Sequence, residues 1–190
     1  MTDSQFIAGI IARDTDVLEQ FIERYERRVY NTAISFVKNE QEAEEITQDV
    51  FLRVWDSIGT FKGESTLATW IYRITVSKSL DLIKSKKTRK RFAFITSLTT
   101  QKDEPTIDPP DWIHPGIVTE NRELAGYLYR AIDQLPESQK IAFTLSKMEQ
   151  LSQHEIAGIM QLKEGAVESL LQRAKQNMRK VLEDIYQELK

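Results

Sequence analysis

Apolar residues recur at intervals of three and four along most of the chain, seldom in strict alternation, and glycine is scarce. This period is typical of amphipathic α-helices and not of strands. In the N-terminal part, one stripe predicts a long helix (Phe21, Tyr25, Val29 and Phe36), and another predicts the next helix (Ala43, Ile46, Val50, Val54 and Ile58). A third helix, over about 65–86, carries two apolar stripes (Leu67, Ile71, Ile74 and Leu82; Val76, Leu80 and Ile83).

The C-terminal part predicts a helix-turn-helix. A helix through Leu124, Leu128 and Ile132 precedes Pro136, where a new helix begins. Ser152 and Glu155 have the spacing of a capping box, which starts a short helix over about 152–160. After a break, a longer helix over about 165–189 carries one buried stripe (Val167, Leu171, Ala174, Met178 and Val181). A short helix, a turn and a longer helix with a polar face are typical of DNA-binding proteins.

Four of the five prolines lie between Pro105 and Pro115, in a polar stretch. Proline disfavours helix at its own position and at the preceding residue. We therefore expect an all-α protein with two helical domains, 1–92 and 117–190, joined by a flexible linker over 93–116. Fully extended, this linker would span at most roughly 80 Å.

The outer face of the last predicted helix is chemically suited to a major groove. Glutamine can read adenine, arginine can read guanine, and glutamate can accept a hydrogen bond from cytosine. The candidate DNA-binding residues on this face and its flanks are Glu168, Ser169, Gln172, Arg173, Lys175, Gln176 and Arg179. The alternative is an ordinary solvated helix face.

Charge is segregated along the chain, although the net charge is only −3. Five acidic residues and no basic one lie within 40–49, and six basic residues and no acidic one lie within 84–91. The acidic helix suits a basic protein partner, with apolar anchors. Its candidate residues are Glu44, Glu45, Gln48, Asp49, Leu52 and Trp55. A plain solvated face is the alternative.

The third predicted helix combines aromatic and basic residues, as single-stranded DNA binding requires, because bases stack on aromatic rings while cations neutralise phosphates. A loop over 61–65 precedes this helix, and the basic cluster follows. The candidate single-stranded DNA-binding residues are Phe61, Lys62, Ser65, Trp70, Arg73, Ser77, Lys78, Lys84, Lys86 and Lys87. An isolated tryptophan such as Trp70 is more often a core residue.

Composition excludes several classes of protein. The chain has no cysteine, so disulfides and thiolate metal sites are excluded, and we expect neither a metal nor a cofactor. We see no signal peptide and no apolar run long enough to span a membrane. A cytosolic protein without membrane insertion is the expectation.

Three segments resemble the extracytoplasmic-function (ECF) group of sigma-70 family sigma factors. Residues 42–55 are similar to the segment that binds core RNA polymerase, and residues 69–74 with Leu80 and Asp81 to the −10 melting and recognition segment. Leu135-Pro136-Glu137 and residues 151–174 resemble the −35-binding helix-turn-helix. The three motifs occur in the family's order on both sides of the expected linker.

The resemblance implies a transcription-initiation factor and not an enzyme. The acidic helix would bind the clamp coiled coil of the largest polymerase subunit, and the 61–65 loop would capture an unstacked base of the −10 element. The helix-turn-helix would read the −35 element, which lies on the order of 60 Å away along the duplex at 3.4 Å per base pair. An anti-sigma factor is a further implied partner.

The sequence departs from the family's usual residues at four positions. Ser77 stands in place of asparagine, Gln161 in place of the glycine of the turn, and Glu168 and Leu170 in place of basic residues. Ser77 implies a different base preference at the −10 contact, Gln161 implies a left-handed residue at an energetic cost, and Glu168 and Leu170 imply a −35 sequence other than the family's usual one. The combination resembles sigma factors of the Bacteroidetes group.

Two other functions are open on the sequence alone. A free-standing helix-turn-helix regulator would bind duplex DNA without polymerase, but it would leave the acidic and aromatic-basic helices unexplained. A metal-dependent hydrolase would use Glu44, Glu45, Asp49 and His154, but His154 lies beyond the expected linker, and no spacing supports a ligand set.

Overall fold

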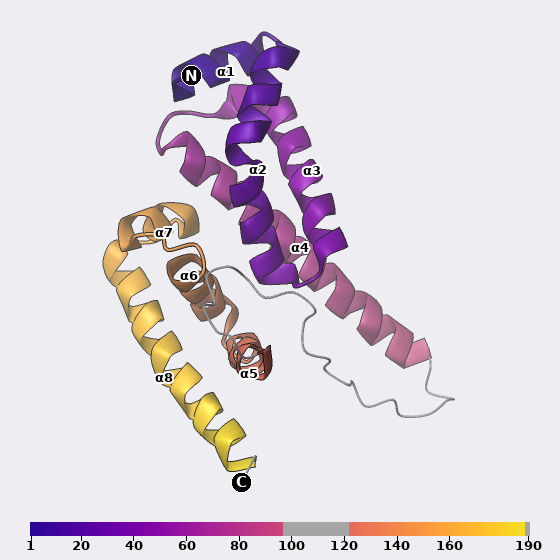
Figure 1. Ribbon diagram of the computed structural model, residues 1–190, viewed down its shortest axis with the longest axis vertical. Helices are drawn as coiled ribbons and strands as arrows, with labels where there is room; N and C mark the ends of the chain where they lie inside the picture. Colours follow the sequence, from indigo (N-terminus) through magenta and orange to yellow (C-terminus); the bar gives the residue numbers. More distant parts are fainter. Residues whose placement is uncertain (97–121, 189–190) are drawn as a thin grey trace.

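The computed structural model describes residues 1–96 and 122–188, and in these ranges every regular element is a helix (Figure 1). The N-terminal domain contains α1 (Asp3–Ile11), α2 (Thr15–Val37), α3 (Glu40–Ser57), the 3-10 helix η1 (Ile58–Thr60) and α4 (Leu67–Thr96). The C-terminal domain contains α5 (Arg122–Asp133), α6 (Glu137–Lys147), α7 (Gln153–Met160) and α8 (Glu164–Glu188). The expectation of an all-α fold with two helical domains is confirmed.

Short polar side chains start the helices of the N-terminal domain. Asp14 accepts hydrogen bonds from the backbone of Asp16 and Val17 at the start of α2, and Asn39 accepts one from Glu42 at the start of α3. Each cap satisfies amide groups that the first turn of a helix leaves without partners. The apolar stripes of α2, α3 and α4 then meet in one core, which we call the first cluster and which includes Phe21, Val50 and Leu67.

Two features of the N-terminal domain differ from the expectation. The helix α1 was not predicted, although Thr2 and Gln5 form a capping box at its start, and its Phe6 and Ile10 are buried in the first cluster. The helix α4 continues to Thr96, past the boundary expected near residue 92. Most of the expected 93–116 linker, and the expected start of the second domain at residue 117, lie outside the described residues.

In the C-terminal domain, the expected capping box of α7 is present, since Ser152 and Glu155 each bond to the other's backbone. The helix ends at Gln161, whose φ of 56° is left-handed. A glutamine can therefore occupy the position that usually holds glycine, at an energetic cost. The stripe of α8 is buried as expected from Val167 to Met178, whereas Val181 is half-buried. It is divided between a C-terminal cluster that contains Ala174 and Met178 and a second cluster that contains Val167 and Leu171.

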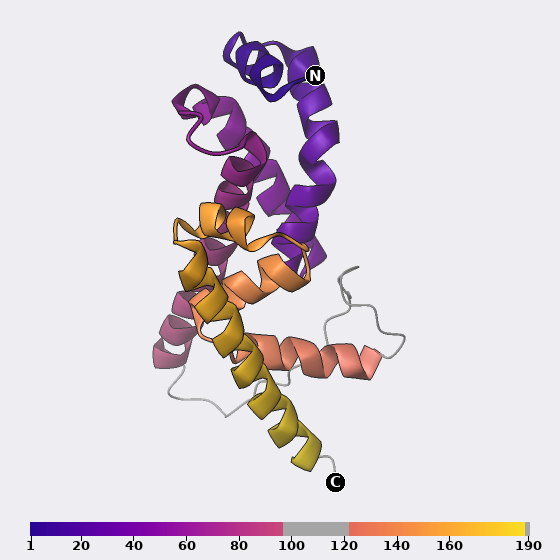
Figure 2. The same cartoon turned by 90° about the vertical axis from the view of Figure 1, so that its left-hand side faces the viewer.

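The second cluster joins the two domains, and we call it the interdomain cluster. Its buried residues from the N-terminal domain are Phe36 and Val76, and Tyr72, Leu80 and Ile83 of α4 pack against them. The C-terminal domain contributes residues of α6, α7 and α8, among them Leu145, Ile156 and Val167. The second apolar stripe predicted on α4 thus packs against the other domain, with Val76 buried and Leu80 and Ile83 half-buried. Figures 1 and 2 both show α7 beside the N-terminal bundle.

Candidate protein- and nucleic-acid-binding surfaces

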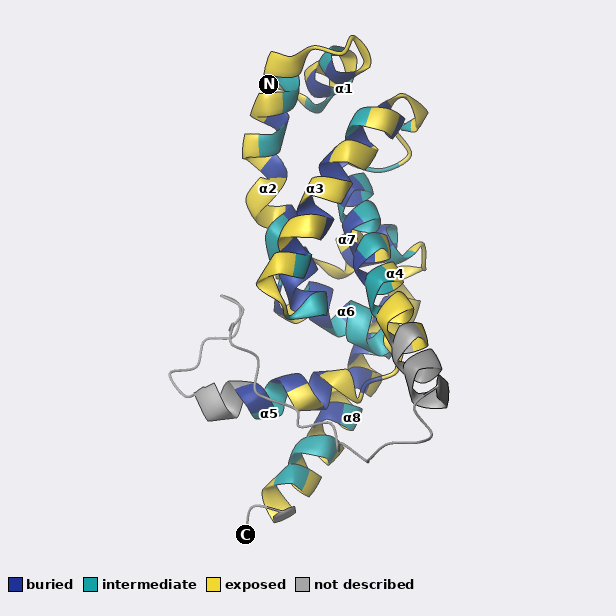
Figure 3. Ribbon diagram, turned by 90° about the vertical axis from the view of Figure 1, so that its right-hand side faces the viewer, coloured by how far each residue is buried: buried dark blue, intermediate teal, exposed yellow. Residues whose placement is uncertain are grey.

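The acidic face of α3 is exposed over its whole length. Its stripe toward the bundle is buried, and its predicted outward side chains are exposed: Glu44, Glu45, Gln48, Asp49 and Leu52. Figure 3 shows this alternation of buried and exposed positions along α3. Leu52 is 62% exposed, which is unusual for a large apolar side chain in a folded domain. An exposed leucine among carboxylates is suited to contact with another protein.

Trp55 is less accessible than the sequence suggested. It is half-buried because Arg13, in the turn between α1 and α2, covers it. The Arg13 guanidinium carbon lies 4.7 Å from the centre of the Trp55 ring, and Nη1 donates a 2.8 Å hydrogen bond to the Trp55 carbonyl. A cation over an indole face is favourable. Arg13 therefore holds the C-terminal end of α3 against the α1–α2 turn, a role that no pattern in the sequence indicates.

Two lysines of α4 pair with acidic residues of α3, and one of these pairs, Glu42–Lys86, joins the acidic segment 40–49 to the basic segment 84–91. Asp49 and Lys78 form an ion pair with 2.9 Å between Oδ2 and Nζ, and Glu42 forms one with Lys86. Lys84 pairs with Glu137 of the C-terminal domain, with 3.2 Å between Nζ and Oε1. The Asp49–Lys78 and Lys84–Glu137 pairs are exposed enough for water to screen them, so each is worth no more than about 1 kcal/mol. The side chain of Lys87 lies outside the described residues.

The loop before α4 presents an aromatic pair. The rings of Phe61 and Trp70 lie 5.6 Å apart, centre to centre, at an angle of 56°. Both side chains are half-buried, and Trp70 also packs on the first cluster, so this tryptophan belongs partly to the core. Lys62 is exposed, Ser65 is half-buried, and Gly63 has a φ of 73° that favours glycine. The loop thus holds the half-buried ring of Phe61 next to the exposed cation of Lys62.

Arg73 contacts the other domain instead of solvent. Its Nε and Nη2 donate hydrogen bonds of 2.8 and 2.6 Å to the Gly158 carbonyl in the last turn of α7. The neighbouring Tyr72 is half-buried against the interdomain cluster, and this burial raises the pKa of its phenol to about 12, with a smaller contribution from Glu149. Of the predicted −10 residues nearby, Ser77 is exposed and Lys78 is half-buried. Arg73 is therefore not available to DNA in this arrangement.

The outer face of α8 is exposed at every predicted position. The seven side chains are Glu168, Ser169, Gln172, Arg173, Lys175, Gln176 and Arg179. Ser169 donates a hydrogen bond to the Gly165 carbonyl one turn earlier. Arg173 and Gln172 point outward beside the buried stripe, without a partner domain over them. This polar face of α8 is therefore accessible to a partner.

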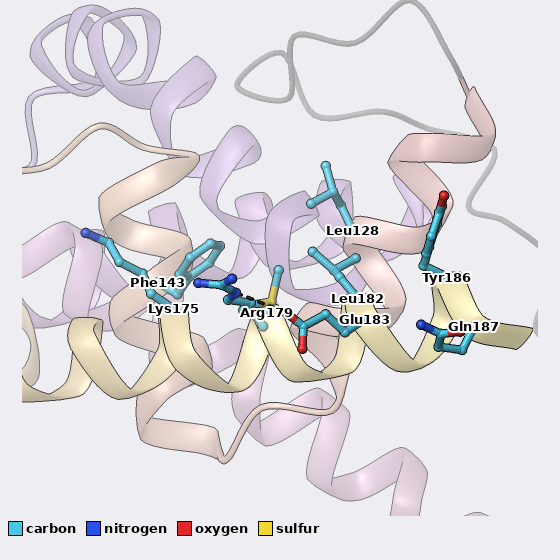
Figure 4. A pocket seen from close by; sticks show the side chains of 9 residues that line it. Leu128, Phe143, Lys175, Arg179, Leu182, Glu183, Tyr186 and Gln187 are labelled. Carbon is cyan, nitrogen blue, oxygen red and sulfur yellow. Dashed lines mark hydrogen bonds and ion pairs between the residues drawn. The ribbon is translucent and has the colours of Figure 1, made fainter.

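Two of these residues also border a groove on the flank of α8. The groove has a volume of about 530 Å³ and is lined by residues of α5, α6 and α8 (Figure 4), including Leu128, Phe143, Met178, Lys175 and Arg179. Arg179 Nε lies 3.0 Å from Glu183 Oε1 on the same helix. Arg179 is thus at the edge of the face, toward the groove.

The alternative of a metal site finds no support in the geometry. His154 Nδ1 lies 2.8 Å from Glu164 Oε1 in its own domain and not beside the carboxylates of α3. Within residues 1–96 and 122–188, no group of three histidine, aspartate or glutamate side chains is arranged to hold a metal ion. In the same ranges, no helix is both long enough and apolar enough to cross a membrane.

Comparison with known proteins gives the same division of the chain. A model of sigma-70 region 2 matches residues 21–89, and a model of sigma-70 region 4 matches residues 125–178. The chain is 26% identical to the RNA polymerase sigma-H factor of Pseudomonas aeruginosa, over 98% of this chain and 96% of that protein. It is 24% identical to the ECF RNA polymerase sigma-E factor of Escherichia coli K12, over 93% of this chain and 92% of that protein.

Two solved structures share the fold. CnrH in complex with the cytosolic domain of CnrY has a TM-score of 0.67 and 18% identity, over 96% of this chain and 97% of that chain. The sigma factor RpoE of Bartonella quintana, in complex with the anti-sigma factor NepR, has a TM-score of 0.57 and 19% identity. That match covers 87% of this chain and 96% of the Bartonella chain. The helix α1 falls outside both family models, yet the CnrH match spans nearly the whole chain.

Proposed function

The chain belongs to the ECF group of the sigma-70 family and directs RNA polymerase to initiate transcription at specific promoters; on this premise we propose which of its surfaces performs each part of that task. It is a specificity factor and not an enzyme, since catalysis belongs to the polymerase. The alternative of a free-standing helix-turn-helix regulator is set aside, because the region 2 match covers the N-terminal domain, which such a regulator does not need.

Core polymerase binds the exposed face of α3. Glu44, Glu45, Gln48 and Asp49 provide charge complementary to a basic partner, and Leu52 provides the apolar anchor. This exposed leucine on an acidic face is the observation that carries the assignment, since neither stability nor solubility accounts for it. The partner is the clamp coiled coil of the largest polymerase subunit. Trp55 contributes from the end of the face, in the position that Arg13 fixes.

The −10 element binds along the 61–65 loop and α4. Phe61 and Trp70 offer ring surfaces for an unstacked base, and Lys62, Arg73, Lys78, Lys84, Lys86 and Lys87 offer charge for the backbone. Ser65 and Ser77 provide hydroxyl groups to bases or phosphates. Because Lys78 and Lys86 pair with Asp49 and Glu42 in the free chain, binding of DNA exchanges these weak ion pairs for phosphate contacts.

The −35 element binds the exposed face of α8. Arg173 is the candidate reader of guanine, Gln172 and Gln176 of adenine, and Glu168 of cytosine through its amino group. Ser169, Lys175 and Arg179 position the helix on the phosphates. Since a carboxylate repels phosphate, the exposed Glu168 favours a −35 sequence with a cytosine opposite the start of α8.

The departures at Ser77, Gln161 and Glu168 also favour assignment to the Bacteroidetes group.

The same fold suggests how the factor is controlled. CnrH and the Bartonella RpoE were solved in complexes, the latter with an anti-sigma factor. An anti-sigma factor that covers the α3 or α4 surface of this chain is therefore part of the proposal. The chain acts in the cytoplasm, where polymerase and the chromosome are.

Charge reversal on α3 tests the polymerase assignment. Asp49→Lys should weaken the binding of purified core polymerase at least about tenfold, since it places a cation in an acidic face at a protein interface. Asp184→Lys, an equal charge change at an exposed position of α8, is the matched control and should bind as the wild type does. Equal affinity of the Asp49→Lys variant and the control would exclude α3 as the polymerase contact.

A further inference from the structure

The helix α1 lies across the end of the N-terminal bundle at which α3 ends (Figure 1). It contacts both α2 and η1. Phe6 and Ile10 bury its inner side in the first cluster. Gly9 packs so closely on α2 that a Cβ atom added there would lie 2.6 Å from Cγ1 of Val17. The outer side of α1 is therefore a fixed part of the protein surface near the end of α3.

The turn between α1 and α2 has a backbone conformation that favours glycine, yet an arginine occupies it. Arg13 has a φ of 61°. Its amide donates to the Ile10 carbonyl, and the Asp14 amide donates to the Gly9 carbonyl, which is a common way for a helix to end on a left-handed residue. An arginine at this position is strained relative to glycine. Strain that a fold retains indicates a role for the side chain.

The side chain of Arg13 acts on Trp55. The guanidinium carbon lies 4.7 Å from the centre of the indole ring, and Nη1 donates a 2.8 Å hydrogen bond to the Trp55 carbonyl. That carbonyl is in the last turn of α3, where carbonyl groups need donors from outside the helix and favour a cation. One arginine thus fixes both the backbone and the ring at the end of α3. Trp55 is only half-buried, so part of its ring is open to a partner.

Two exposed apolar side chains flank this contact. In the part of the chain that the structure describes, five large apolar side chains are exposed, and Ile11 and Leu52 are two of them. Ile11 is 55% exposed and stands two residues before Arg13, at the last position of α1. Leu52 stands one turn before Trp55 on α3. The contact between Arg13 and Trp55 therefore brings both apolar side chains to the same end of the domain, where they indicate a protein-binding surface.

This apolar end continues the acidic face of α3. Asp49, Leu52 and Trp55 follow one another at intervals of three, so each lies beside the next on the helix surface. Carboxylates thus give way to apolar side chains toward the end of α3, and Ile11 extends the apolar part onto α1. A partner that lies along α3 as far as Trp55 therefore reaches the end of α1.

Resting on the polymerase role proposed above for α3, we propose that the end of α1 is the second part of the polymerase-binding surface. Ile11 is an apolar anchor, and Arg13 is a positioning residue that holds Trp55 in the orientation that polymerase contacts. The polymerase segment that binds here is basic beside Asp49 and apolar beside Ile11 and Leu52. A ring that is already fixed loses less conformational freedom on binding, which increases affinity.

A charge at Ile11 tests this surface. Ile11→Asp should weaken the binding of purified core polymerase, without DNA, at least about tenfold, as the loss of an interface anchor does. Ser4→Asp is the matched control, because it adds the same charge at an exposed position of α1 two turns closer to the start of the helix. It should bind as the wild type does. Circular dichroism and urea unfolding show whether both variants are folded, and equal affinities of two folded variants would overturn the proposal.

Arg13→Gly separates positioning from stability. Glycine adopts the left-handed conformation without strain, so the variant should remain folded, with a urea midpoint near that of the wild type. Its affinity for polymerase should nevertheless fall about fivefold, in the range of a lost cation–π contact. Because Arg13 acts through Trp55, the double variant with Trp55→Leu should bind no more weakly than Trp55→Leu alone. Additive losses, or unaltered affinity of Arg13→Gly, would contradict the positioning role.

Asp49→Lys, measured in the same titrations, distinguishes failure of this inference from failure of the proposed function. If Asp49→Lys weakens binding while Ile11→Asp and Arg13→Gly do not, α3 binds polymerase and the extension to α1 is wrong. If Asp49→Lys binds as the wild type does, the assignment of α3 fails, and the proposal for α1 fails with it.

Discussion

Asp49 on α3 and Lys78 on α4 form an ion pair across the proposed polymerase and −10 surfaces, with 2.9 Å between Oδ2 and Nζ. Their side chains are 55% and 38% exposed, so solvent screens the pair and its contribution to stability is at most about 1 kcal/mol. Either partner can therefore leave the pair at little cost. A polymerase contact at Asp49 would release Lys78 for DNA, which links the two binding events.

Lys78→Gln should weaken the binding of holoenzyme to promoter DNA and reduce the salt dependence of that binding. One phosphate contact is lost, so the slope of log affinity against log salt should fall by about 1. Titrations of a labelled promoter at several salt concentrations measure this. Lys180→Gln, on α8 outside the proposed set, is the control, and an equal slope for the two variants would exclude Lys78 from the DNA contact.

Arg173→Ala should weaken binding that depends on the −35 element. The expected loss is about 1–3 kcal/mol in apparent binding free energy, the value of a bidentate arginine–guanine contact. Arg173→Lys keeps the charge but loses the planar fork, so it should relax base preference at one −35 position. Competition among promoter variants with each −35 base changed measures both effects. An Arg173→Ala protein with unaltered −35 preference would exclude α8 as the reading helix.

Gly9→Ala should destabilise the N-terminal domain, because a Cβ atom there would lie only 2.6 Å from Cγ1 of Val17. Overpacking of this kind costs about 1–3 kcal/mol and exceeds the gain in helix propensity. Chemical denaturation measures the free energy of unfolding. Gly59→Ala should be nearly neutral, because no atom lies within 4 Å of a Cβ added at Gly59. Equal free energies of unfolding for the two variants would show that the contact between α1 and α2 can accommodate the added methyl group.

Asp133 should make the interdomain contact sensitive to acid. Burial raises the pKa of its carboxyl, but Lys38 and Lys140 together outweigh burial, so the pKa lies below its ordinary value of 3.8. A carboxyl with a lowered pKa stabilises the fold above that ordinary value, and this contribution is lost as the pH falls through the lowered value. Burial lowers the pKa of Lys38 as well, from its ordinary value of 10.5, although the Asp133 carboxylate opposes this effect.

Urea unfolding of the wild type and of Asp133→Asn from pH 3 to pH 7 tests this dependence. The difference in unfolding free energy should be largest near neutral pH and shrink below about pH 4. Asp184→Asn, at an exposed position on α8, should show no such trend. A difference between wild type and Asp133→Asn that does not change with pH would mean that Asp133 makes no charge-dependent contact.

The helices and the C-terminal surface could be predicted because they depend on local spacing. The stripe through Val167 and Leu171 places Gln172 and Arg173 outward whatever the rest of the chain does. The second stripe on α4, through Val76 and Leu80, was also visible, but the partner that buries it was not. A pattern shows that a face is buried and does not show against what.

Contacts between segments far apart in the chain could not be predicted. Arg13 covers Trp55 from 42 residues away, and Arg73 reaches Gly158 from 85 residues away. The sequence predicted an accessible Trp55 and a DNA-facing Arg73, and in the structure both are held by other parts of the protein. The capping box of α1 was a local signal that could have revealed this helix, since Thr2 and Gln5 have the required spacing.

Transcription reconstituted from purified core polymerase, this chain and a library of host genomic fragments tests the central claim most directly. We expect transcripts that start downstream of one shared pair of −35 and −10 sequences, and none of these starts with core polymerase alone. Unaltered start sites on addition of the chain, or equally strong binding of the same DNA by the chain without polymerase, would contradict the account.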